Sequence, residues 1–242
     1  MIPKCYKKES LPHLFCPGCG YGVILKSLGF TIDQLKIAHQ TVLGLDIGCA
    51  LLAWNLFNVD TIQTHHGRTI PVMAGLKLAK PKAIALALVG DGGAYAIGLQ
   101  SLLHSAHRND PLTVIVVNNS LYAMTGGQMA PTTLEGEITT TTPLGRDCQK
   151  TGLPFLGPET VIPLTNQFAY VARVSIRNPI VLEETFKKAI LNQMKGKGFS
   201  LVEVLSVCPT NWKTDAEKTF QFLQEMENYY RLGEIKKPKE GE

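Results

Sequence analysis

Uninterrupted apolar runs alternate with amphipathic segments along this chain. The run Ala83–Val89 stops at Gly90, and residues 112–117 form a second run of the same kind. Short apolar runs bounded by glycine or proline predict strands that are buried on both faces of a parallel sheet. Between them, apolar residues at helical spacing over 97–106 predict a helix that ends before Pro111. Together these segments predict a strand–helix–strand unit with two parallel strands.

The same patterns extend the prediction to most of the chain. Strands are expected within residues 38–48, 168–174 and 199–205, and helices at 21–28, 50–54, 72–78, 179–195 and from Trp212 onward. Residues 129–167 are rich in threonine, proline and glycine, and they predict an irregular segment that closes over a site or contacts a partner. The expected fold is α/β, a doubly wound, mostly parallel sheet. A single domain is expected over 1–242, with a flexible tail at 236–242.

Composition narrows the class of protein. The chain has 242 residues, 45% of them hydrophobic, and a formal net charge of +4. Lysine and arginine are scattered rather than concentrated in a stripe, so nucleic-acid binding is not indicated. No apolar stretch follows the charged N-terminal residues, and no run is long enough to cross a bilayer. We therefore expect a cytoplasmic protein without membrane contact.

Two polar turns follow the strands of the central unit. Gly90-Asp91-Gly92-Gly93 follows the first strand, and Asn118-Asn119 follows the second. The carboxyl ends of parallel strands meet at one sheet edge, where ligands bind. There, the Asp91 carboxylate, the Asn119 amide oxygen and the Leu121 carbonyl could hold Mg²⁺. The glycines allow close approach of a diphosphate, and the next helix N-terminus favours it. A tight turn without a ligand is the alternative.

Four of the six cysteines lie where strands end or helices begin. These four are Cys16, Cys19, Cys49 and Cys208. Such positions can gather at one edge of a parallel sheet, and four thiolates suffice for a [4Fe–4S] cluster. A structural zinc site is the alternative, and the C-x-x-C loop alone would also suit a redox dithiol. Cys5 and Cys148 fall outside this pattern and are expected to be ordinary thiols.

The two polar turns resemble the diphosphate motif of thiamine diphosphate enzymes. The longer string NNSLYAMTGGQMAPTT, residues 118–133, is similar to the thiamine-binding (beta) subunit of 2-oxoacid:ferredoxin oxidoreductases. The segments C-P-G-C, G-C and S-x-C-P-T also resemble the cluster ligands of that family. The resemblance implies a thiamine diphosphate-binding fold with thiamine diphosphate, Mg²⁺ and a [4Fe–4S] cluster as cofactors.

The resemblance also implies a reaction. A 2-oxoacid would be oxidatively decarboxylated to acyl-CoA and CO₂, and the electrons would pass through the cluster to ferredoxin. Pyruvate-specific relatives carry asparagine where this chain has Met124, which favours 2-oxoglutarate or a branched-chain 2-oxoacid. His66 and Met124 would line the reacting part of the cofactor. The alternative for His66 is a residue that caps its own helix or is satisfied in the core.

The cofactor-binding residues implied by the resemblance come from several turns. They are Gly48, Cys49, His66, Gly90, Asp91, Gly92, Gly93, Asn119, Leu121, Ala123, Met124 and Thr125. Activation of thiamine also needs a carboxylate, usually a glutamate on a separate pyrimidine-binding domain, for which this chain has no room.

We therefore expect an alpha-type partner subunit that supplies the pyrimidine-binding domain and its glutamate. A ferredoxin-like subunit or ferredoxin would accept the electrons, and coenzyme A would accept the acyl group. The chain alone should be inactive. Two other functions remain open: a subunit of a non-redox thiamine-dependent 2-oxoacid decarboxylase with a structural zinc site, and a non-catalytic electron-transfer subunit.

Overall fold

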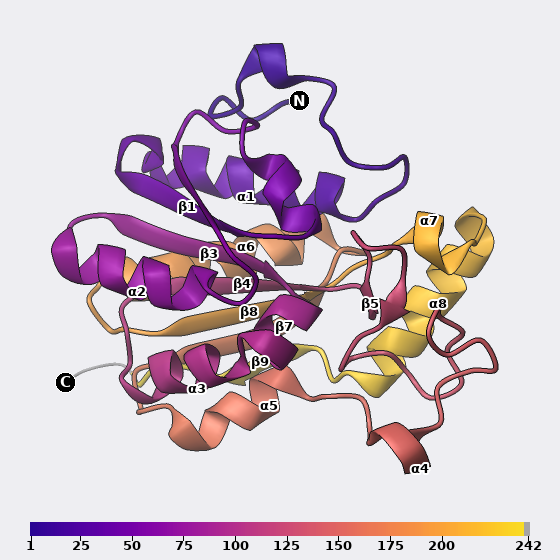
Figure 1. Ribbon diagram of the computed structural model, residues 1–242. Coiled ribbons are helices and arrows are strands. Elements are labelled where there is room, and N and C mark those ends of the chain that lie inside the picture. The colour runs from indigo at the N-terminus through magenta and orange to yellow at the C-terminus, as the bar shows by residue number, and fades with distance from the viewer. Residues whose placement is uncertain (240–242) are drawn as a thin grey trace.

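The computed structural model describes residues 1–239, and a sheet of seven strands lies at the centre of this described part (Figure 1). The strands are β1 (Thr41–Asp46), β2 (Asp60–Thr64), β3 (Ile84–Gly90), β4 (Thr113–Asn118), β7 (Tyr170–Ser175), β8 (Ser200–Leu205) and β9 (Gly233–Lys236). Their order across the sheet is β2-β1-β3-β4-β8-β7-β9, and only β9 pairs antiparallel. A small hairpin joins β5 (Leu121–Tyr122) to β6 (Gln128–Met129). The mostly parallel α/β fold expected from the sequence is confirmed.

Helices cover both faces of the sheet, as Figure 1 shows. On one face lie α1 (Tyr21–Leu35) and α6 (Pro179–Met194), and on the other lie α2 (Thr69–Ala79), α3 (Leu99–His107) and α5 (Gly157–Val161). The remaining helices are α4 (Cys148–Thr151), α7 (Pro209–Trp212) and α8 (Ala216–Tyr229).

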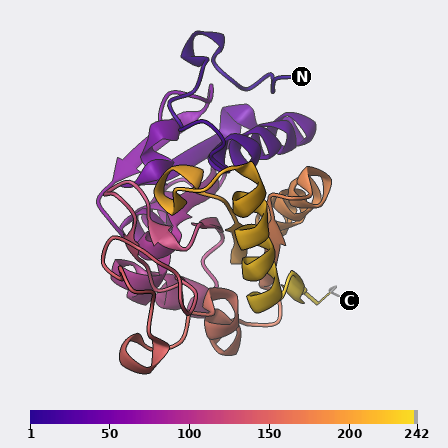
Figure 2. The same cartoon turned by 90° about the vertical axis from the view of Figure 1, so that its right-hand side faces the viewer.

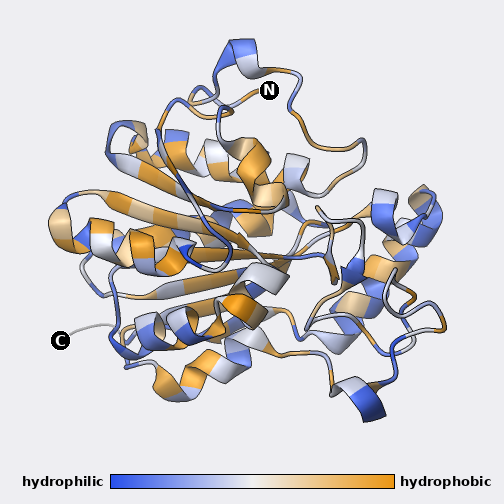
Figure 3. Ribbon diagram, viewed as in Figure 1, coloured by the Kyte–Doolittle hydropathy of each residue, from blue (hydrophilic) through white to orange (hydrophobic). Residues whose placement is uncertain are grey.

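The strands separate two hydrophobic cores. Along β3, Leu86 and Leu88 point toward α1 and α6, whereas Ala87 and Val89 point toward the opposite helices. Because side chains alternate between faces, a strand buried on both sides needs an apolar residue at every position. This explains the unbroken apolar runs in the sequence, which Figure 3 shows as hydrophobic strands inside more hydrophilic outer helix faces.

The chain changes its direction of winding between β1 and β3. From β1 it moves outward to β2, and from β3 it moves the other way to β4. In open α/β sheets, such a switch point leaves a crevice at the carboxyl ends of the strands, where ligands bind. Figure 2 faces this end of the molecule, where α7, α8 and the irregular segment after β6 lie.

Several element predictions need correction. Helix α1 continues to Leu35 instead of ending at residue 28, and residues 49–53 form a short 3₁₀ helix, η3 (Cys49–Ala53). Strands β2 and β9 were not predicted, because β2 is polar and partly exposed and β9 is a short edge strand. Lys236, which was assigned to the tail, ends β9 and pairs with Val171. The last three tail residues, 240–242, lie outside the described residues.

The predicted irregular segment at 129–167 is largely confirmed, with only the short helices α4 and α5 and one 3₁₀ turn between Met129 and Gln167. Within residues 1–239, no helix combines the length and the apolar character that crossing a bilayer requires.

Candidate cofactor-binding site

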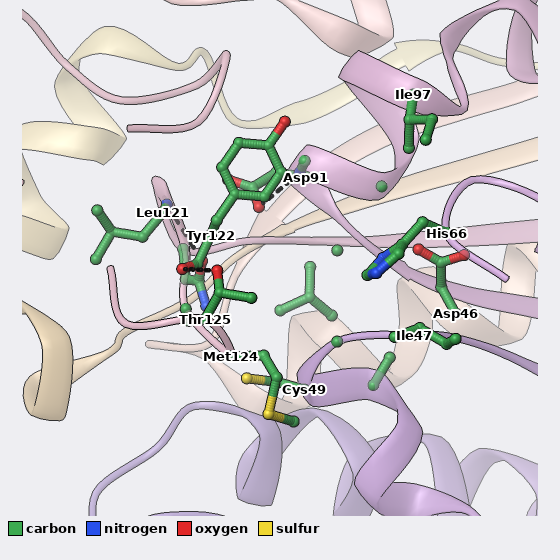
Figure 4. Close-up of a pocket in the computed structure, with 18 of the residues that line it drawn as sticks. Asp46, Ile47, Cys49, His66, Asp91, Ile97, Leu121, Tyr122, Met124 and Thr125 are labelled. Atoms are coloured by element: carbon green, nitrogen blue, oxygen red, sulfur yellow. Dashed lines mark hydrogen bonds between the residues drawn. The ribbon is translucent and has the colours of Figure 1, made fainter. Parts of the chain in front are cut away.

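A cavity of about 360 Å³ lies at the carboxyl ends of β1, β3 and β4. Every residue that the sequence assigned to cofactor binding lines this cavity, from Gly48 to Thr125. Figure 4 shows Asp46 and His66 on one side of it, and Leu121, Tyr122 and Thr125 on the other. The structure thus brings together four turns that are distant in the sequence.

Asp91 is a buried carboxylate at the end of β3. Its Oδ1 accepts a hydrogen bond from the backbone N–H of Gly92 at 2.9 Å, and its Oδ2 accepts one from the hydroxyl of Thr132. Burial raises the pKa of Asp91 to about 7, even though both hydrogen bonds lower it. A nearby cation would stabilise the charged form and offset this cost of burial. The chemistry of Asp91 therefore fits a metal ligand.

The turn after β4 presents oxygen atoms beside Asp91. Asn119 Oδ1 accepts a hydrogen bond from the backbone N–H of Leu121 at 3.3 Å, and Asn118 Oδ1 accepts one from Ser120 N–H at 3.1 Å. Ser120 has a φ of 67°, a left-handed conformation that reverses the chain tightly. Carboxylate, amide and carbonyl oxygens are the ligands that Mg²⁺ prefers. The donor set of Asp91, Asn119 and Leu121 therefore fits this ion.

Two glycines after Asp91 pack closely against neighbouring turns. A Cβ at Gly92 would lie 2.1 Å from the ring of Tyr122, and one at Gly93 would lie 2.2 Å from Oδ2 of Asp46. Any side chain at these positions would fill space that the neighbouring turns occupy. This packing therefore requires glycine at both positions.

The irregular segment after β6 forms hydrogen bonds with Asp91 and with the turn after β4. Thr132 donates to Asp91, and the hydroxyl of Thr133 donates to the carbonyl of Ser120 at 2.5 Å. The buried guanidinium of Arg146 donates to the carbonyls of Pro131 and Gly152, at 3.0 and 2.9 Å. The sequence predicted that this segment closes over a site, but it did not identify these residues.

His66 and Met124 lie at opposite walls of the cavity. His66 belongs to the turn between β2 and α2, and Met124 belongs to the turn between β5 and β6. Met124 remains 47% exposed, as expected for a residue at the mouth of the cavity. Both side chains are therefore available to whatever occupies the cavity.

The four predicted cluster cysteines converge beside the cavity. Burial raises the pKa of Cys49 to about 12, with further contributions from Cys19, Cys208 and Cys16. Burial likewise raises the pKa of Cys19 to about 11, with contributions from Cys208 and Cys16. Of the four, Cys49 lines the cavity itself.

The loops that carry these cysteines are bonded to each other. The backbone N–H of Gly20 donates to the carbonyl of Val207 at 3.2 Å, which joins the C-x-x-C loop to the segment before Cys208. Cys5 and Cys148 take no part in this group. Among residues 1–239, no three His, Cys, Asp or Glu side chains are close enough to share a metal ion. The four cysteine thiols are therefore not arranged as ligands of a single metal ion.

Sequence reasoning missed part of the cavity lining. The missed residues are Tyr21, Asp46, Ile47, Ala50, Ile97, Val117 and Tyr122. Asp46 and Val117 end or nearly end strands, so their position at the strand ends could have indicated them. Tyr21 gave no such indication, because it reaches the cavity from the start of α1.

Comparison with known proteins identifies the family. Residues 46–204 match the family described as the C-terminal TPP binding domain of thiamine pyrophosphate enzymes. The 2-oxoglutarate synthase subunit KorB of Archaeoglobus fulgidus is 37% identical over 219 residues, which cover 90% of this chain and 78% of KorB. The chain belongs to the thiamine pyrophosphate-binding subunits of the 2-oxoacid oxidoreductases.

Other relatives of this family extend the similarity. The ketoisovalerate oxidoreductase subunit VorA of Methanothermobacter thermautotrophicus is 40% identical over 214 residues, which cover 87% of this chain and 45% of VorA. The chain thus spans less than half the length of that relative. The structure of a 2-oxoglutarate:ferredoxin oxidoreductase from Magnetococcus marinus superposes with a TM-score of 0.82 at 26% identity, covering 100% of this chain and 86% of the other. Thiamine pyrophosphate is therefore the cofactor of the family to which this chain belongs.

Proposed function

We propose that this chain is the catalytic subunit of a 2-oxoacid:ferredoxin oxidoreductase, which converts a 2-oxoacid and coenzyme A to acyl-CoA and CO₂. The observation that carries the proposal is the cavity itself, because Asp91, Asn119 and Cys49 all line it at one sheet edge. Relatives that act on 2-oxoglutarate and ketoisovalerate support the reaction class. We propose one of these two substrate types rather than pyruvate, because Met124 stands where pyruvate-specific relatives carry asparagine.

Two cofactors would share the chemistry. When bound, thiamine diphosphate supplies the carbanion chemistry that removes CO₂ from the 2-oxoacid, and a [4Fe–4S] cluster supplies a one-electron path away from it. Asp91, Asn119 and the carbonyl of Leu121 would hold Mg²⁺, and the backbone at Gly92 and Gly93 would lie against the diphosphate.

We propose that other residues at the cavity contact the substrate and cofactor or exclude water. The imidazole of His66 can donate a hydrogen bond to a negatively charged oxygen at its wall of the cavity. Met124 and Ile97 would exclude water from the reacting part of the site, which strengthens every electrostatic interaction inside it. We propose Cys16, Cys19, Cys49 and Cys208 as the cluster ligands.

Partner subunits would complete the site. The side chains that line the cavity in the described part of the chain include two aspartates, Asp46 and Asp91, and no glutamate. We assign the activating glutamate to an alpha-type partner that supplies the pyrimidine-binding domain. Large apolar side chains are exposed near the cavity and on the irregular segment, among them Ile97, Ile138, Leu144 and Leu153. Such surface suits a protein interface. A ferredoxin-like subunit or ferredoxin would receive the electrons.

Activity should therefore depend on assembly. The isolated chain should show no 2-oxoacid-dependent reduction of viologen dye, because the activating carboxylate is absent. Co-expression with the alpha-type and ferredoxin-like subunits should restore coenzyme A-dependent dye reduction with 2-oxoglutarate or 3-methyl-2-oxobutanoate. Turnover by the isolated chain, or a complex that decarboxylates without reducing the dye, would contradict the proposal. The second result would indicate a non-redox decarboxylase.

A further inference from the structure

Asp46 is a buried carboxylate at the cavity that the sequence did not assign to the site. It is the last residue of β1 and is 1% exposed. Its side chain lies on the same side of the cavity as His66 (Figure 4). Burying a carboxylate is costly unless hydrogen bonds or a cation compensate for the lost water. The partners of Asp46 therefore indicate its role.

Oδ1 of Asp46 accepts two hydrogen bonds from the segment that carries His66. The donors are the backbone N–H of Gly67 at 2.9 Å and the hydroxyl of Thr69 at 3.0 Å. Thr69 is the first residue of α2, and a carboxylate beside a helix N-terminus is stabilised by the helix dipole. Burial raises the pKa of Asp46, whereas these two hydrogen bonds and the nearby His66 lower it.

The other side of this turn is closely packed. Gly67 has a φ of 65°, and a Cβ there would lie 2.6 Å from the backbone nitrogen of Gly98. Oδ2 of Asp46 in turn leaves no room for a Cβ at Gly93, on the turn after β3. Asp46 thus fixes the turn of His66 against both the end of β1 and the turn after β3.

We propose that Asp46 is a positioning residue for His66, and that it supports thiamine diphosphate binding by holding His66 at the cavity wall. This inference rests on the proposed function, because it takes thiamine diphosphate as the occupant and His66 as one of its contacts. A purely structural role, as a cap of α2, is the alternative. The two roles differ in whether the loss of Asp46 still matters for binding once His66 has been replaced.

A double-mutant cycle separates the two roles. The apo form of the enzyme assembled with its partner subunits is titrated with thiamine diphosphate and Mg²⁺ in a calorimeter. We expect Asp46→Ala to weaken binding about tenfold and His66→Gln to weaken it by a similar factor. The double variant should bind no more weakly than His66→Gln alone. Asp46→Asn keeps an oxygen for Gly67 and Thr69, and it should recover most of the lost affinity.

Thr41→Val is a matched control for loss of stability. The hydroxyl of Thr41 donates to the carbonyl of Ile37 at 2.9 Å, at the opposite end of β1. This variant should lower the melting temperature without changing the affinity for thiamine diphosphate. If Asp46→Ala does not fold, Thr69→Val, which removes one of the two hydrogen bonds, replaces it in the cycle.

Additive losses of affinity for the Asp46 and His66 variants would overturn the positioning role, and so would failure of Asp46→Asn to recover binding. Absence of thiamine diphosphate binding by the wild-type enzyme would instead overturn the proposed function on which this inference rests.

Discussion

Replacing Asp91 with alanine should abolish retention of thiamine diphosphate by the assembled enzyme. Asp91 is the one charged side chain in the proposed Mg²⁺ donor set, and its removal leaves only neutral oxygens to hold the ion. We expect the affinity for thiamine diphosphate and Mg²⁺ to fall at least about 100-fold, because even indirect supports of a metal ligand contribute about 10- to 100-fold. Cofactor content after gel filtration and a calorimetric titration would measure this loss.

Loss of the fold must be separated from loss of the site. Within residues 1–239 no lysine, arginine or histidine forms an ion pair with Asp91, and burial raises its pKa. The cost of burying this carboxylate offsets the loss of its two hydrogen bonds, so Asp91→Ala should change the melting temperature of the apo protein little. Asp60→Asn is a matched control, because Asp60 is an exposed carboxylate at the amino end of the edge strand β2, whereas the cavity lies at the carboxyl ends of the strands. It should retain full cofactor content. Normal thiamine diphosphate occupancy in Asp91→Ala would show that the metal ligand is misassigned.

Serine in place of any one of Cys16, Cys19, Cys49 and Cys208 should cost the enzyme most of its iron and sulfide. Three of these thiols have a pKa raised by burial and by the other thiols, so that four negative sulfurs could not coexist there without a cation. Binding to iron deprotonates the thiols and removes that penalty. Iron and sulfide analysis of the anaerobically purified enzyme would measure the loss.

The two other cysteines provide the control. The pKa of Cys5 is raised by burial and by Asp33, and Cys148 lies on α4, on the irregular segment. Serine at either position should leave the iron content unchanged. Zinc in place of iron, or full iron content in Cys208→Ser, would contradict the proposed ligand set.

The sequence predicted the site best where its signals are local. Asp91 and Asn119 each follow a buried apolar run directly, so the strand ends and the polar turns could be located together. Both residues line the cavity, together with the further cofactor-binding residues that the resemblance implied. Among the residues that came from the resemblance is His66, whose position in the sequence alone left two interpretations open.

Residues whose role depends on distant contacts could not be predicted in this way. Asp46 accepts a hydrogen bond from Gly67, and Asp91 accepts one from Thr132. These partners are far apart in the sequence, and no periodic pattern of residues indicates such pairs. The end of α1 was missed for a similar reason. Gly29 lies inside the helix and leaves room for Pro3, because a Cβ there would be 2.7 Å from the proline ring. In the sequence, the same glycine suggests a helix end.

A single-turnover experiment with the assembled, anaerobically purified enzyme and no external electron acceptor tests most directly whether electrons pass from the cavity to the cysteine group. Addition of the 2-oxoacid should bleach the visible absorption of the iron–sulfur cluster as it accepts one electron. Coenzyme A should then release acyl-CoA while the second electron passes to the ferredoxin-like subunit of the assembled enzyme. The bleaching should be absent in Asp91→Ala. Release of CO₂ with unchanged cluster absorption would contradict the proposed function, because it would show that decarboxylation at the cavity passes no electrons to the cysteine group.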